Sequence, residues 1–124
     1  MEKDLTKIYI ALRKILKQYE NPLIPKIDVD GKYDLWSIKK VEFMGRIRDE
    51  VYFAGLVIQS NYVGFYFMPI YSDEGLKQLF HPDLIKLLKG KSCFHIKTLD
   101  VSLENHINDA IKIGYKLYKE KGWI

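Results

Sequence analysis

The chain has little of what would mark a secreted or membrane-bound protein. It contains one cysteine in 124 residues, which excludes an internal disulfide and suits a reducing compartment. No apolar run approaches the roughly 20 residues that span a bilayer, and residues 1–10 lack the apolar core of a signal peptide. We therefore expect a cytoplasmic protein without a membrane partner.

Charge of neither sign dominates the composition. There are 20 basic and 16 acidic residues, giving a net charge of +4 with the histidines neutral. Nucleic-acid binding would need a basic stripe with stacking aromatic rings, whereas these lysines are interspersed with acids. Nucleic acid is therefore not an expected partner.

Sequence signatures of catalysis are also missing. We find no glycine-rich phosphate loop, serine elbow, paired carboxylates or metalloprotease motif. A function other than catalysis is therefore favoured. The length and the ordinary apolar content of 48% predict a single domain over residues 1–124, without repeats or a linker.

Aromatic and β-branched residues are concentrated in residues 51–71, which read VYFAGLVIQSNYVGFYFMPIY. These residue types fit a pleated sheet. Asparagine tolerates the left-handed conformation that short turns require. We therefore predict a β-hairpin with its turn centred between Ser60 and Asn61.

The register of this hairpin assigns its side chains to two faces, because alternate residues of a strand point in opposite directions. The apolar face, expected to lie under helices, holds Tyr52, Ala54, Leu56, Ile58, Val63, Phe65, Phe67 and Pro69. The other face holds Phe53, Gly55, Val57, Gln59, Tyr62, Gly64, Tyr66 and Met68. Strand glycines indicate either a closely approaching ligand or an aromatic ring that covers them, and both alternatives stay open.

Apolar residues at helical spacing predict long helices over residues 4–20 and 100–121. Gly114 lies on the apolar stripe of the second helix and predicts close packing there. The remaining predicted elements are a connector at 22–25, a turn at Asp30-Gly31, one strand or two short strands at 33–44, and a charged turn at 45–50. After the hairpin we predict a short helix or turn at 72–79, a short helix at 83–89 and a strand at 91–97. This order predicts an α+β fold, with the N- and C-terminal helices packed on one face of an antiparallel sheet.

Four segments resemble the YdhG-like bacterial family, which is related in fold to frataxin: YFAGLVIQ, YVGFYFMPIY, GKSCFHIK and GYKLYKEKGW. The resemblance covers residues 50–123 and implies a frataxin-like two-layer sandwich. The family has no general activity, although one branch is described as an iron chaperone.

We expect no cofactor, and the resemblance implies iron as the alternative. Frataxins bind iron on an acidic ridge of the first helix and the adjoining strand. The acidic group nearest to those elements here is Asp28, Asp30 and Asp34. These aspartates also resemble the opening of a calcium loop, but the glutamate that would complete the loop is missing. They are the alternative metal site, and a turn is the favoured interpretation.

Cys93 and His95 stand two residues apart on a predicted strand and therefore project to the same side. If Phe94 and Ile96 face the helices, this pair joins the glycine-containing face of the hairpin. A Cys/His pair can bind a soft metal or form a reactive thiolate, but zinc sites use three or four protein ligands. We expect a packed thiol and a hydrogen-bonded histidine, with a thiol-dependent enzyme as the alternative.

The leading hypothesis is a small binding module that uses the helix-free face of its sheet. A sheet face that exposes large apolar groups often marks a contact surface. The expected ligand is a small molecule, another protein or a second copy that would form a homo-oligomer. The predicted ligand-binding residues are Gln59, Tyr62, Tyr66, Met68, Cys93 and His95.

Overall fold

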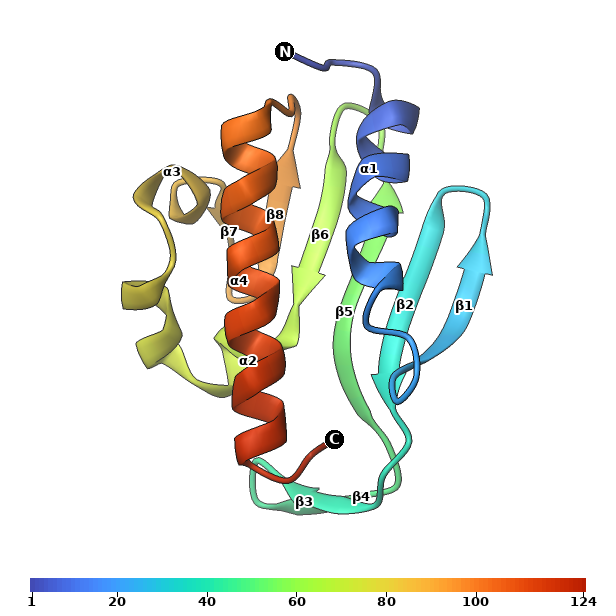
Figure 1. Ribbon diagram of the computed structural model, residues 1–124, viewed down its shortest axis with the longest axis vertical. Coiled ribbons are helices and arrows are strands. Elements are labelled where there is room, and N and C mark those ends of the chain that lie inside the picture. Colours follow the sequence, from blue (N-terminus) through green and yellow to red (C-terminus); the bar gives the residue numbers. More distant parts are fainter.

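The computed structural model describes residues 1–124 as one layer of helices on one layer of strands. The strands form a six-stranded antiparallel sheet. Helices α1 (Leu5–Lys17) and α4 (Val101–Glu120) lie side by side across one of its faces (Figure 1). This arrangement confirms the predicted α+β fold. None of the helices combines the length and the hydropathy that crossing a bilayer requires.

The sheet has the strand order β1-β2-β5-β6-β8-β7, so the predicted hairpin lies at its centre. Its strands are β1 (Ile24–Val29), β2 (Lys32–Ser37), β5 (Val51–Ile58), β6 (Val63–Phe67), β7 (Leu88–Lys89) and β8 (Cys93–Ile96). The other elements are a ribbon of β3 (Val41–Phe43) and β4 (Arg46–Arg48), and the short helices α2 (Met68–Ser72), η1 (Glu74–Leu79) and α3 (Pro82–Ile85).

Helix α1 begins where a capping side chain is available. The Asp4 carboxylate accepts hydrogen bonds from the backbone N–H groups of Thr6 and Lys7, donors that the first turn cannot use internally. The helix ends at Lys17, before the predicted limit at residue 20. Its buried residues recur at helical spacing: Ile8, Tyr9, Leu12, Ile15 and Leu16.

The hairpin of β5 and β6 has the predicted register. Gly55 pairs with Tyr66, and Leu56 pairs with Phe65. The loop at residues 59–62 is closed by a hydrogen bond of 2.8 Å from the Gln59 N–H to the Tyr62 carbonyl. Leu56 and Phe65 are at most 1% exposed, which confirms that their side of the hairpin is the one the helices cover.

A β-bulge in β5 reverses the predicted faces of two residues. Trp36 of β2 pairs with Tyr52, and the register then shifts, which leaves Phe53 as an extra residue in β5. The Phe53 ring lies among the helices, with its centroid 5.2 Å from that of Tyr118, while Tyr52 turns to the other face. The predicted faces of Phe53 and Tyr52 were therefore wrong, because the prediction assumed strict alternation along the strand and an inserted residue breaks that alternation.

The second strand of the hairpin ends earlier than predicted. β6 stops at Phe67, and Pro69 lies in the first turn of α2, where its fixed φ favours a helix start. Gly114 of α4 crosses at this point. A Cβ atom there would lie 2.8 Å from the Pro69 Cγ atom and would overlap the Phe67 ring. The close packing predicted at Gly114 is confirmed, and its partners are the end of β6 and α2.

Strand pairing, rather than local pattern, sets the other boundaries that differ from prediction. The predicted connector at 22–25 runs into the edge strand β1, which joins β2 through the predicted turn at Asp30-Gly31. The predicted charged turn at 45–50 contains β4, which pairs with β3. The predicted helix at 83–89 divides into α3 and the short strand β7.

Candidate functional site

The sheet face opposite α1 and α4 carries no helix (Figure 1). Aromatic side chains from several strands and the hairpin loop lie on it. Residues that pair across neighbouring strands share a face, and two such rows cross this one. We call it the helix-free face. One row is Asp34, Gly55, Tyr66 and Cys93; the other is Lys32, Val57, Gly64 and His95; Trp36, Tyr52 and Tyr62 complete the face.

Gly64 lets two tyrosine rings converge at the centre of the helix-free face. A Cβ atom on Gly64 would lie 3.2 Å from the Tyr66 ring and 3.7 Å from the Tyr62 ring. The Tyr62 ring is also stacked on His95, with a centroid separation of 3.8 Å and an interplanar angle of 12°. The structure therefore brings together three of the predicted ligand-binding residues, Tyr62, Tyr66 and His95.

The second glycine of the face is covered. A Cβ atom on Gly55 would overlap the Tyr52 hydroxyl and the Asp34 carboxylate. Burial raises the pKa of Asp34 and of Tyr52, because a charge on either group would lose its contact with water. Polar groups, a hydroxyl and a carboxylate, therefore cover Gly55, and the covering aromatic ring of the second alternative is found at Gly64.

Cys93 lies beside Tyr66 and is half-buried. Burial raises the pKa of the Cys93 thiol, and the hydrogen bond with Tyr66 offsets this only in part. His95 stacks on Tyr62 and makes no hydrogen bond to the thiol. A nucleophilic thiolate is favoured by a nearby cation or base, and neither is among the groups that shift the pKa of Cys93.

Two of the predicted ligand-binding residues lie away from this centre. Met68 belongs to α2 and packs against the core, because β6 ends one residue before it. Its predicted place on the helix-free face was wrong. Gln59 lies in the hairpin loop, at the end of the face, where its backbone N–H closes the turn.

The three aspartates of the alternative metal site do not converge. Asp28 lies on the helix side, where the Arg13 side chain of α1 binds it with an Nε–Oδ1 distance of 3.0 Å. This hydrogen bond holds the pKa of Asp28 below its usual value. Asp34 lies on the opposite face of the sheet, and Asp30 lies in the turn between β1 and β2. No common ion could reach all three.

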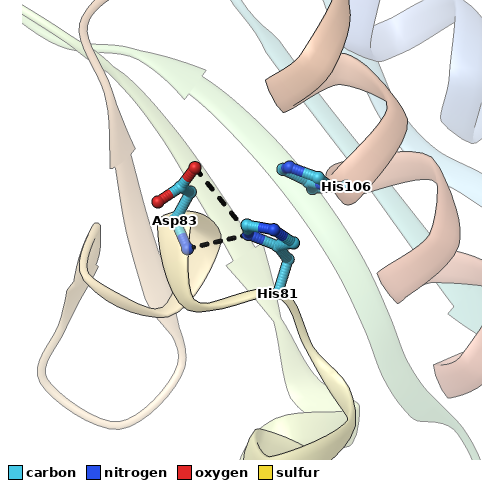
Figure 2. Close-up of side chains that lie close together, drawn as sticks. All are labelled: His81, Asp83 and His106. Carbon is cyan, nitrogen blue, oxygen red and sulfur yellow. Dashed lines mark hydrogen bonds and ion pairs between the residues drawn. The ribbon is translucent and has the colours of Figure 1, made fainter.

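A cluster of two histidines and one aspartate lies between α3 and α4 (Figure 2). His81 precedes α3, and its Nδ1 atom accepts a hydrogen bond of 3.0 Å from the Asp83 N–H. The ring of His106, from the second turn of α4, is stacked on that of His81 with centroids 3.7 Å apart. One potential ligand atom from each of the three residues lies within 4.8 Å of the other two.

Sequence reasoning missed this cluster, because nothing local links a residue of α4 to one that precedes α3. A cavity of about 370 Å³ adjoins it and is lined by Asp83, His106 and Ser102. The cavity also lies beside the end of α3 and the ends of β7 and β8, where basic side chains line it. Its lysines are Lys86, Lys89 and Lys97.

Fold and surface together define a two-layer α+β protein with an aromatic sheet face and a separate histidine cluster. Comparison of the chain with protein families, with curated proteins and with solved structures finds no match. The resemblance to the YdhG-like family and to frataxin therefore stays a prediction.

Proposed function

We propose that this protein is a binding module whose helix-free face docks onto an acidic surface of a protein partner. The observation that carries the proposal is a group of four half-buried aromatic side chains on a face without a helix: Trp36, Tyr52, Tyr62 and Tyr66. Tyrosine and tryptophan are the residues that most often dominate the energy of protein interfaces.

The shape of the face favours a protein over a small molecule. Small ligands are usually held in a concave site that covers most of their surface. Four cavities of this protein lie between α3 and α4 and beside α1. From the helix-free face, only His95 and the edge residue Lys89 line one of them. A shallow aromatic face suits a broad contact with another protein.

Charge favours an acidic partner. Lys32 lies on the face, Lys89 pairs with Cys93 at its edge, and all of the Lys32, Lys89 and Lys97 side chains are exposed. Two copies of a chain with a net charge of +4 would repel each other, so a second copy is disfavoured as the partner.

Nucleic acid is the other acidic macromolecule, and the ring geometry disfavours it. Bases stack on free aromatic faces. Here His95 occupies one face of the Tyr62 ring, and the Lys26 ammonium lies 4.6 Å from the centroid of the Trp36 ring. Protein docking uses ring edges and hydroxyl groups as well as ring faces, so it tolerates these contacts.

The test compares Tyr66→Glu with Ile10→Glu. Ile10 is 58% exposed on α1, on the opposite layer, so its variant carries the same charge change away from the proposed site. Immobilised wild type and Ile10→Glu should retain the same acidic protein from a lysate of the source cells, whereas Tyr66→Glu should lose it. The retained protein should elute as salt is raised, because the lysine contacts are screened.

Three results would contradict the proposal. Retention of the same proteins by Tyr66→Glu would exclude the helix-free face. A dimer in analytical ultracentrifugation that Tyr66→Glu dissociates would make a second copy the occupant. Binding of single-stranded oligonucleotides that Tyr66→Glu abolishes would make nucleic acid the occupant.

The reducing environment that suits a lone cysteine leads us to place this binding in the cytoplasm.

A further inference from the structure

The cluster of His81, Asp83 and His106 has the chemistry of a transition-metal site. It is the one group of three potential metal-ligating side chains that the fold brings together. Imidazole nitrogen and carboxylate oxygen are the ligands of borderline first-row divalent ions, and two histidines with one carboxylate form a recurrent three-ligand set. We propose that these three residues bind such an ion, with Zn²⁺ as the probe.

The ligand atoms lie up to about 1.5 Å farther apart than a bound zinc ion would hold them. Zinc lies about 2.0–2.2 Å from nitrogen and oxygen ligands, which places neighbouring ligand atoms about 3.3 Å apart. The His81 Nδ1 and Asp83 Oδ2 atoms are 3.8 Å apart, and the whole set lies within 4.8 Å. Both imidazole rings must turn from their stacked arrangement so that their lone pairs converge (Figure 2).

These rotations disturb little of the structure. The side chains of His81 and Asp83 are 45% and 59% exposed, so no buried contact holds them. An ion at His81 Nδ1 displaces the hydrogen bond from the Asp83 N–H, a group at the protein surface that water can then solvate. The movement needed is confined to side chains and leaves α3 and α4 in place.

A further polar contact orients one of the ligands. The Ser102 Oγ atom lies 3.3 Å from the Nε2 atom of His106. A hydroxyl on one ring nitrogen leaves the other nitrogen for the ion, and metal-binding histidines are commonly held in this way. Three protein ligands also leave a coordination position open, and Asp83 and His106 both line the adjoining 370 Å³ cavity.

The basic side chains of the cavity oppose the ion. The Lys86 ammonium lies 3.5 Å from an Asp83 carboxylate oxygen and competes for it, whereas Lys89 lines the same cavity without a contact to the cluster. Lys86→Gln should therefore tighten zinc binding by about threefold, and Lys89→Gln should change it less. An equal effect of the two substitutions would show that Asp83 is not a ligand.

The direct test is calorimetric titration of the full chain with zinc chloride, supported by the visible absorption of bound Co²⁺. His81→Asn, which keeps a side chain able to cap α3, and His106→Gln should each lower the affinity more than about tenfold. His95→Gln is the matched control, because His95 is the third histidine and lines the same cavity but is not one of the three clustered ligands. It should leave the affinity within about twofold, the spread expected of a substitution that removes no ligand.

The outcomes decide the proposal. One zinc ion per chain, lost in both cluster variants and kept in the control, supports it. Binding that survives His81→Asn and His106→Gln, or that His95→Gln weakens as much, overturns it, as does the absence of saturable binding to the wild type. Circular dichroism of each variant establishes that it is folded. Bound zinc should also raise the thermal midpoint of the wild type and not of His106→Gln.

Discussion

At the scale of single residues, the character of the helix-free face depends on Gly64. Any larger side chain there would meet the Tyr66 ring, 3.2 Å from the Cβ position, and would separate the two tyrosines. A Cβ atom on Gly64 would also lie 3.7 Å from the Cys93 sulfur. The absence of a side chain at Gly64 therefore leaves room for the two tyrosine rings and for the Cys93 thiol beside them.

The raised pKa of Cys93 predicts a slowly reacting thiol. Only the thiolate reacts with iodoacetamide, so a raised pKa lowers the reactive fraction at pH 8 and moves the rise in rate to higher pH. The rate of alkylation should be lower in the folded protein than in the same protein unfolded in urea. A faster reaction of the folded protein would contradict this expectation and revive the thiol-dependent enzyme.

At the scale of elements, α4 is held against the end of the sheet by the absence of a side chain at Gly114. The helix approaches so closely that a Cβ atom would overlap the Phe67 ring and lie 2.8 Å from the Pro69 Cγ atom. The bulge at Phe53 also contributes to the packing of α4, because it turns the Phe53 ring towards the helices. The centroid of this ring lies 5.2 Å from that of Tyr118 in α4. Both features fix how the helices sit on the strands.

Gly114→Ala should destabilise the protein although alanine favours helices. The substitution gains about 1 kcal/mol of helix propensity. Overpacking against Phe67 and Pro69 costs about 1–3 kcal/mol, and the depth of the overlap places the cost towards the upper end. We expect the free energy of unfolding in urea to fall by about 1–2 kcal/mol. Lys112→Ala, on the exposed side of α4, is the control and should change it little; a stabilised Gly114→Ala would refute the close approach.

At the scale of the whole molecule, Trp123 joins the helical layer to the β3–β4 ribbon. Its ring lies 4.5 Å from that of Phe43 and 5.1 Å from that of Tyr118, centroid to centroid. Its Nε1–H donates to the Glu42 carbonyl at 3.0 Å, and its own carbonyl accepts from the Ser37 hydroxyl. Elements that are far apart in the sequence thus meet at one residue.

Trp123→Ala should therefore cost about 3 kcal/mol of unfolding free energy, the lower end of the range for large aromatic truncations, because Trp123 is half-buried. Trp36→Ala is the matched control: it is also half-buried, but it contacts neighbouring strands of one sheet face. The control should lose less stability in urea unfolding. Equal losses would mean that the bridging position of Trp123 adds nothing to the free energy of unfolding.

The part of the site that could be predicted follows from strand alternation. Period-two spacing placed Tyr66 opposite Gly55, and Cys93 and His95 on one side of their strand, as the structure has them. Met68 was misplaced because Pro69 starts a helix, and a local pattern of apolar residues does not distinguish that start from a continuing strand. Regular elements were predictable, and interruptions of them were not.

The sequence by itself determined the α+β class, the central hairpin and its register, since these depend on the spacing of apolar residues and on one turn. Only the tertiary structure decided that Phe53 turns inward, that Asp28 and Asp34 lie on opposite sides of the sheet, and that His81 meets His106. The physical reason is range. Periodicity reports which way a side chain faces along its own element, whereas a cluster forms from elements whose meeting depends on how the whole core packs.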